Sequence, residues 1–218
     1  MSERPAALAK KLAFFGAITA SLSHELKNVL ATINEFSGLL DDLCQAAAGG
    51  KAPSPERLVN ISGKISKQVK RGETLIQRLN RFAHSVDEPR ASVELKELLE
   101  RICIICDRFA KLGQATLERR FPEGEREITS DPFTLQQVVY LGVRAALATA
   151  GQQRRITVAL ELDAPRPTIA IESADPIGPE DPENTEHALL RELATELGAE
   201  LQWTGSATPA RIALALPG

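Results

Sequence analysis

A histidine, a glutamate and an asparagine lie within five residues of one another in the segment Ser-Leu-Ser-His-Glu-Leu-Lys-Asn. They are His24, Glu25 and Asn28. A neutral imidazole is a nucleophile near neutral pH, so His24 could accept a group in a covalent transfer reaction. Asn28 is four residues further along and would share a helix face with it. Exposed histidines often have no function, so these residues by themselves leave an ordinary surface histidine as an equal alternative.

A heptad pattern places this histidine on the outside of a long helix. Apolar positions recur at alternating steps of three and four, which predicts a helix over about residues 5–48 that packs one seam against a partner helix. With Thr19 at position a, His24 falls at position f, away from the seam. Gly49 and Gly50 would end the helix. The seam consists of Leu12, Phe15, Thr19, Leu22, Leu26, Val29, Ile33, Phe36, Leu40 and Leu43.

A second heptad helix follows a short turn. Ser54 is a suitable N-cap, Pro55 suits the first helical position, and Glu56 favours the positive end of the helix dipole. The two helices form an antiparallel hairpin. Because one hairpin buries its seam only partly, two copies are expected to pair as a homodimeric four-helix bundle. The second seam consists of Leu58, Ile61, Ile65, Gln68, Gly72, Leu75, Leu79, Phe82 and Val86.

Basic residues lie along the second helix. A hairpin folded about Lys51 would bring His24 opposite residues 77–81, with Arg78 and Arg81 nearest to it. Together with Lys27, these cations could bind an acidic partner or a phosphoryl group, although such runs are usually solvated helix faces. The basic residues are Lys64, Lys67, Lys70, Arg71, Arg78 and Arg81.

After residue 88 the pattern changes to alternating helices and strands, which predicts a small α/β sandwich with helices on one face of a sheet. The fold class is therefore expected to be α+β, with a helical hairpin domain over 1–88 and an α/β domain over 89–218. Helices are expected at 93–112, 132–150 and 185–197. Strands are expected at 116–121, 155–162, 168–173, 200–204 and 211–216.

Composition excludes several classes of protein. The net charge of −3 gives no support to nucleic-acid binding. Three cysteines favour a reducing compartment over a disulfide framework. Cys103 and Cys106 form a CxxC pair without a second pair or nearby histidine, which favours two buried thiols over a metal site. The apolar segment after Lys11 is too short to span a membrane and continues the heptads, so a cytoplasmic protein without membrane contact is expected.

The segment Ser-His-Glu-Leu-Lys-Asn-Val-Leu-Ala-Thr-Ile resembles the phosphoacceptor box of two-component histidine kinases, and the resemblance extends over nearly the whole chain. It implies that His24 is the phosphorylated residue of a dimerisation hairpin. The second region resembles the kinase ATP-binding domain. Residues 135–139 resemble the start of the helix with the magnesium-linked asparagine, and 168–181 resemble the strand and turn of the adenine-binding aspartate.

The positions that bind ATP in this family carry other residues here. The metal-linked asparagine falls on Ala145, the adenine-binding aspartate on Ser173, and the following glycines on Asp175 and Ile177. The last helix opens at Thr185, where a glycine-rich lid would be. Binding the phosphates of ATP takes a metal or glycine backbone amides. We therefore expect a degenerate ATPase-like domain with no cofactor and no metal of its own.

A phosphoacceptor helix without a phosphate donor resembles the dimeric histidine phosphotransferases of phosphorelays. The resemblance implies transfer between His24 and aspartates of response-regulator receiver domains, with the receiver supplying Mg²⁺. It also implies that Glu25 orients the imidazole, while Asn28 could hold a phosphoryl oxygen or position a water. His84 and His187 are expected to be surface or linker residues.

Three alternatives remain open from the sequence. The chain could be a divergent sensor histidine kinase that phosphorylates itself. It could be a non-catalytic pseudokinase that sequesters a regulator. It could also act mainly as a phosphatase of a response regulator, in which case Asn28 would matter more than His24.

Overall fold

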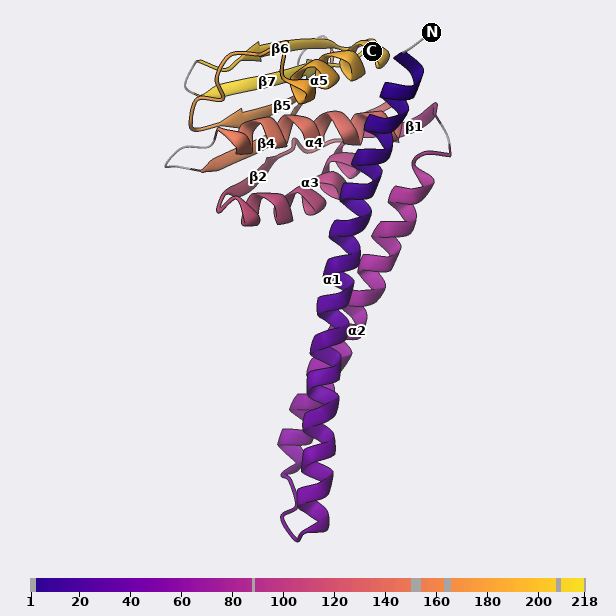
Figure 1. Cartoon of the computed structure of the whole chain (residues 1–218), viewed down its shortest axis with the longest axis vertical. Helices are drawn as coiled ribbons and strands as arrows, with labels where there is room; N and C mark the ends of the chain where they lie inside the picture. The colour runs from indigo at the N-terminus through magenta and orange to yellow at the C-terminus, as the bar shows by residue number, and fades with distance from the viewer. Residues whose placement is uncertain (1–2, 88, 150–153, 163–165, 207–208, 218) are drawn as a thin grey trace. The chain divides into compact units, whose positions relative to one another are not determined.

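The computed structural model of the protein describes residues 3–87, 89–149, 154–162, 166–206 and 209–217 (Figure 1). The chain forms two compact units, Met1–Ala83 and His84–Gly218. The first is all helical and the second combines helices with sheets, so the fold class is α+β as predicted.

The first unit is a hairpin of two long helices, α1 (Glu3–Ala48) and α2 (Pro55–His84). The helices meet along part of the predicted seams. Leu12 of the first seam is 61% exposed, whereas Phe14 and Ile18, which lie outside that seam, are buried. Gly72 of α2 faces Val29, because a Cβ added to this glycine would lie 3.4 Å from Val29 Cγ1. Near the open end, the Phe82 ring packs on Phe14 and Phe15, with centroids 5.5 and 5.4 Å apart. These contacts confirm the antiparallel hairpin.

The turn of the hairpin folds back over the end of α1. The Lys51 amide donates to the Ala46 carbonyl at 2.9 Å, and the Gly50 amide donates to the Ala47 carbonyl at 3.0 Å. Gly50 has a φ of 87°, a left-handed conformation that glycine adopts without strain. At the start of α2, the Ser54 hydroxyl accepts from the Arg57 amide at 3.4 Å, which confirms the predicted N-cap.

The second unit contains a five-stranded mixed sheet and three helices. The strand order is β2-β4-β5-β7-β6, with β2 parallel to β4 and the other neighbours antiparallel. The predicted elements are all present, and their ends differ from the predictions by at most two residues among the described residues. The elements are β1 (Ala91–Glu94), α3 (Leu95–Leu112), β2 (Thr116–Arg120), β3 (Glu127–Ser130), α4 (Pro132–Ala148), β4 (Arg155–Glu161), β5 (Thr168–Ser173), α5 (Thr185–Glu196), β6 (Glu200–Thr204) and β7 (Ala210–Ala215).

One face of this sheet packs against the helices. Side chains that point to it are fully buried, as at Ile156, Ile169 and Ile212. The approach of α4 to the sheet is close enough to require a glycine, since a Cβ on Gly142 would lie 2.8 Å from the Cδ1 atom of Ile171. The core of the unit therefore lies between the sheet and the helix layer.

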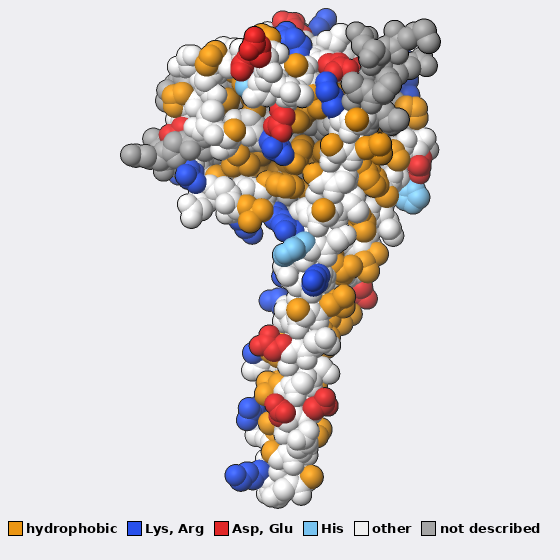
Figure 2. Space-filling model, viewed as in Figure 1, with side chains coloured by type: hydrophobic (Ala, Val, Ile, Leu, Met, Phe, Trp, Pro, Cys, Tyr) orange, Lys and Arg blue, Asp and Glu red, His pale blue; other side chains and the backbone are white. Residues whose placement is uncertain are grey.

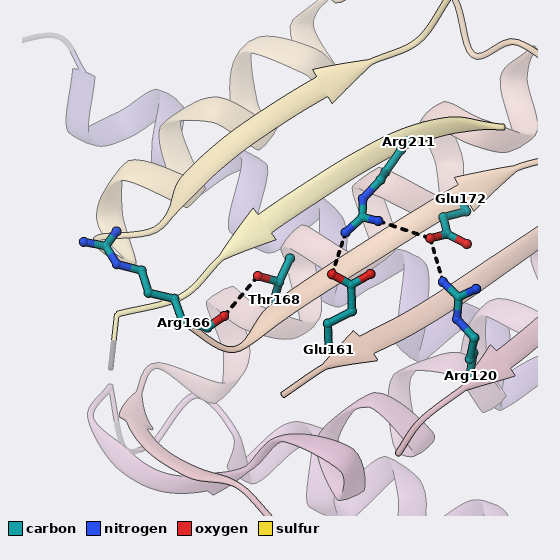
Figure 3. Close-up of polar contacts among 6 residues, drawn as sticks. All are labelled: Arg120, Glu161, Arg166, Thr168, Glu172 and Arg211. Atoms are coloured by element: carbon teal, nitrogen blue, oxygen red, sulfur yellow. Dashed lines mark hydrogen bonds and ion pairs between the residues drawn. The ribbon is translucent and has the colours of Figure 1, made fainter. Parts of the chain in front are cut away.

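The other face of the sheet carries a network of charged side chains (Figure 3). Arg211 of β7 donates to Glu161 of β4 at 2.7 Å and to Glu172 of β5 at 3.5 Å. Glu172 also accepts from Arg120 of β2 at 2.6 Å. Four strands are thus linked by alternating charges on the face of the sheet opposite to Ile171 and α4.

Three alanines lie beneath this network. Ala159, Ala170 and Ala213 are paired in register on adjacent strands and are 0%, 0% and 6% exposed. Arg211 reaches Glu161 across this row, because the two residues lie on opposite sides of it in the strand register. The small side chains leave space for the long ones to lie along the sheet, and the apolar stems bury the alanines.

A second, two-stranded sheet of β1 and β3 was not predicted. Both strands are four residues long and pair antiparallel, with Ala91 opposite Ser130. Glu94 ends β1 and also caps α3, since its carboxylate accepts from the Lys96 and Glu97 amides. The sequence pattern of a helix starting at residue 93 therefore included the last residues of a strand.

Candidate functional site

His24 lies on the outer face of α1. It is exposed, as its heptad position predicts, while the neighbouring Leu26 and Val29 face α2. The helix continues without interruption through this segment. The imidazole is therefore held on a regular helix and is accessible to a docking partner.

Asn28 is the residue that contacts the imidazole. Its amide Nδ2 lies 3.3 Å from the His24 Nδ1 atom, as the spacing of four residues on a helix allows. Both side chains are exposed. The Nε2 atom of His24 is on the opposite side of the ring from this contact.

Glu25 faces a different group. Its carboxylate lies 3.7 Å from the Arg71 guanidinium of α2, and the two side chains are 26% and 58% exposed. Consecutive residues on a helix do not face each other, so Glu25 is poorly placed to reach the His24 ring. The sequence assigned no separate role to Arg71.

The register of the hairpin differs from the one expected. Glu25 lies opposite Arg71, and Phe82 lies opposite Phe14 and Phe15. The expectation that Arg78 and Arg81 are the cations nearest to His24 is therefore wrong, because Arg81 neighbours Phe82 and lies toward Phe14. The two helices are therefore not paired symmetrically about Lys51. Binding of a partner by Lys27, Arg78 and Arg81 stays a prediction.

The positions at which the resemblance places nucleotide-binding residues carry side chains with internal contacts. Ala145 of α4 is 5% exposed. Ser173 is 1% exposed, and its hydroxyl accepts from the Asp175 amide at 3.2 Å. The Asp175 carboxylate accepts from the Arg154 amide at 3.0 Å. Ile177 is 2% exposed. These side chains take part in packing and backbone hydrogen bonds.

The segment after β5 is attached to the loop after β6. The Ile177 and Gly178 amides both donate to the Gly205 carbonyl, at 3.0 and 3.2 Å. The Trp203 indole donates to the Gly178 carbonyl at 2.9 Å. A side chain on Gly205 would collide with the Gly178 backbone, so this approach requires a glycine.

His187 has a structural contact that the sequence did not predict. Its Nδ1 atom accepts from the Asp181 amide at 3.1 Å, and its ring lies 4.5 Å from that of Trp203. The only sign of this contact in the sequence was the position of His187, two residues after the start of a helix. His84, the remaining histidine, is exposed, and its Nδ1 atom lies 2.7 Å from the Asp87 carboxylate.

The two cysteines of the CxxC segment are buried, as predicted. Desolvation raises the pKa of the Cys103 thiol to about 12 and raises the pKa of Cys106 well above its usual range. Both groups are thus held as neutral thiols, which are poor nucleophiles and poor metal ligands. Cys44, on α1, is exposed.

No protein-family model and no curated protein matches the chain. Solved structures do match. The catalytic domain of histidine kinase ThkA shares 14% identity, with a TM-score of 0.53 over 60% of this chain and 96% of that one. The Acinetobacter baumannii histidine kinase AdeS shares 15% identity, with a TM-score of 0.49 over 88% of this chain and 96% of that one.

The ThkA match covers about the share of the chain that lies in the second unit. Its low sequence identity limits it to the fold. It shows that the second unit has the fold of a histidine kinase catalytic domain. Among the residues described, no helix has the length and hydropathy of a membrane span.

Proposed function

We propose that the protein is a histidine phosphotransferase of a two-component phosphorelay. It passes a phosphoryl group between His24 and the aspartates of response-regulator receiver domains, and it has no autokinase activity. The observation that carries the proposal is the contrast between an exposed His24 and nucleotide-site positions used for internal contacts.

The internal contacts of the second unit argue against use of ATP. Ala145 has no oxygen in its side chain to bind Mg²⁺, and Ser173 cannot supply the carboxylate that would accept from an adenine amino group. Asp175 and Ile177 replace glycines with side chains that brace Arg154 and fill the core. Restoring a nucleotide site would require these contacts to be broken as well as new ligands to be added.

The transfer reaction is an in-line displacement at phosphorus. A lone pair of the His24 imidazole forms the new N–P bond, while the bond between phosphorus and the receiver's aspartyl oxygen breaks and its electrons return to that carboxylate. Transfer to a second receiver is the reverse. Mg²⁺ is supplied by the receiver, and the phosphoryl charge is offset by Lys27, with Arg78 and Arg81 binding the receiver at a distance from the ring.

A homodimer would bury apolar residues that the single hairpin exposes. Leu30 of α1 and Val69 and Ile76 of α2 are 56%, 44% and 46% exposed. Val69 and Ile76 are one heptad apart, so they share a face of α2. Figure 2 shows hydrophobic side chains on the hairpin surface. These residues support a second hairpin as the partner.

The test compares two phosphate donors. Purified protein is incubated with radiolabelled ATP, and separately with receiver domains labelled through acetyl phosphate. We expect acid-labile label on the wild-type protein from a receiver and none from ATP. Label taken directly from ATP would identify a kinase. No label from either donor, across a panel of receivers, would identify a binding protein.

A receiver phosphatase is the second candidate, and the position of Asn28 favours it. Its exposed amide lies beside His24, where it could hold a water for attack on an aspartyl phosphate. The two functions differ in the fate of the label. A phosphatase would release inorganic phosphate from a labelled receiver even when His24 is replaced by alanine.

A further inference from the structure

The family resemblance assigns the orientation of the imidazole to Glu25, but the contacts on α1 point to another residue. Glu25 pairs with Arg71 at 3.7 Å, and Asn28 lies 3.3 Å from His24 Nδ1. A helix brings residues four apart together and separates consecutive ones. The side chain that can fix this ring is therefore the amide of Asn28.

The Asn28 amide can form a hydrogen bond with either tautomer of a neutral His24 imidazole. With Nδ2 toward the ring, Asn28 donates to Nδ1, and the ring proton is on Nε2. A half-turn of the amide places Oδ1 at the same position, where it accepts from an Nδ1–H group. Only the second arrangement leaves the Nε2 lone pair free on the outer side of the ring, so only this one supplies an outward-facing nucleophile.

We propose that Asn28 is the positioning residue of the phosphoacceptor, holding His24 as the Nδ1–H tautomer with Nε2 directed at the phosphoryl donor. This inference rests on the proposed function and deepens it. During transfer, Nε2 forms the bond to phosphorus and the Nδ1 proton stays on the ring, hydrogen bonded to Asn28 Oδ1. The positive charge that develops on the imidazole is shared with that oxygen and then passes to water as the proton leaves.

Arg71 has a related effect. By pairing with Glu25, it keeps a carboxylate away from the imidazole. An anion beside the ring would favour the imidazolium, which is not a nucleophile. It would also repel the incoming phosphoryl group. A neutral amide fixes the tautomer without either disadvantage.

The test measures the tautomer directly. Nitrogen-15 NMR of the imidazole distinguishes Nδ1–H from Nε2–H, and the spectrum of His24→Ala assigns the signals, because the chain has three histidines. We expect mainly Nδ1–H in the wild-type protein and a shift toward Nε2–H in Asn28→Leu. Asn34→Leu, which changes another exposed asparagine of α1, is the matched control and should leave the ratio unchanged.

A small donor measures the nucleophile without a receiver. Phosphoramidate transfers its phosphoryl group to a histidine as the P–N bond breaks and ammonia leaves. We expect Asn28→Leu to lower the rate of His24 phosphorylation by about 2-fold to 10-fold, the range that follows from the loss of one hydrogen bond. Glu25→Gln should leave the tautomer ratio as in the wild type.

The outcomes separate this inference from the proposed function. An unchanged tautomer ratio in Asn28→Leu, or a shift caused by Glu25→Gln, overturns the role of Asn28. A tautomer shift accompanied by slower phosphoramidate transfer supports it. If wild-type His24 then accepts phosphate from phosphoramidate but from no receiver, the proposed function is wrong while the positioning by Asn28 stands.

Discussion

The face of α1 that carries His24 and the region around Ser173 in the second unit both carry polar side chains, but these side chains have different partners. On α1, His24 and Asn28 are exposed and contact each other. In the second unit, Ser173, Asp175 and His187 accept hydrogen bonds from the protein's own backbone. A polar group that already accepts a hydrogen bond from the backbone can bind a ligand only by giving up that bond. The comparison supports the proposal that the chemistry takes place on the hairpin.

The largest expected effect comes from removing the exposed imidazole. His24→Ala should abolish phosphoryl acceptance from labelled receivers while leaving the helical circular dichroism unchanged, because an exposed residue at an outer heptad position contributes little to packing. His84→Ala is the matched control, since His84 is also exposed and pairs only at its local turn with Asp87. Label that persists in His24→Ala would contradict the proposal that the chemistry takes place at His24 on the hairpin.

Thiol labelling compares the accessibility of the two units. Cys44 of the hairpin is exposed and should react rapidly with a thiol reagent at pH 8. Cys103 and Cys106 are buried, and their raised pKa values keep them as unreactive thiols. We expect one labelled cysteine per chain in native buffer and three in denaturant, as counted by mass spectrometry. Rapid native labelling of Cys103 would contradict the tight core.

Two glycine substitutions should have opposite effects on stability. Gly142→Ala places a methyl group 2.8 Å from Ile171 Cδ1, so it should lower the free energy of unfolding by about 1–3 kcal/mol. Gly63→Ala, on α2, meets nothing within 4 Å and should raise it by about 0.5–1 kcal/mol through helix propensity. Urea titration followed by circular dichroism measures both. A neutral Gly142→Ala would mean that α4 can move away from the sheet.

Much of this architecture follows from local patterns. The heptads predicted α1 and α2 because each seam buries one stripe of a helix, and alternation predicted β4 and β5 because only one face of the sheet packs on helices. The four-residue strands β1 and β3 carry too few residues for such a pattern. Glu94 is both the last residue of β1 and the N-cap of α3, so the sequence pattern did not show where β1 ends.

The candidate site was predictable in its residues but not in its contacts. His24 and Asn28 were found from their types and spacing. The partner of Glu25 depends on the register in which α1 and α2 pair. The heptad pattern of each helix does not by itself define that register, so Arg78 and Arg81 were placed too near His24. The contact of His187 with Asp181 depends on a loop conformation in the same way.

The smallest expected effect tests whether the segment after β5 is held by side chains as well as by its backbone. Glu180 makes two hydrogen-bonded contacts with Arg191 of α5, one of them at 2.7 Å, and this pairing lowers the pKa of Glu180. A carboxylate whose pKa is lower in the folded state stabilises the fold above its unfolded pKa of about 4.3, and the contribution is lost as the pH falls through the folded value.

Glu180→Gln should therefore lower the free energy of unfolding near pH 7 by about 0.2–1 kcal/mol, since the Arg191 side chain is 56% exposed and solvent weakens the pair. The difference from the wild type should shrink as the pH falls below about 4.3. Glu183→Gln, an exposed residue of the same segment, is the control. A difference that is constant with pH would mean that Glu180 acts through packing. The backbone bonds to Gly205 would then be the main attachment of this segment.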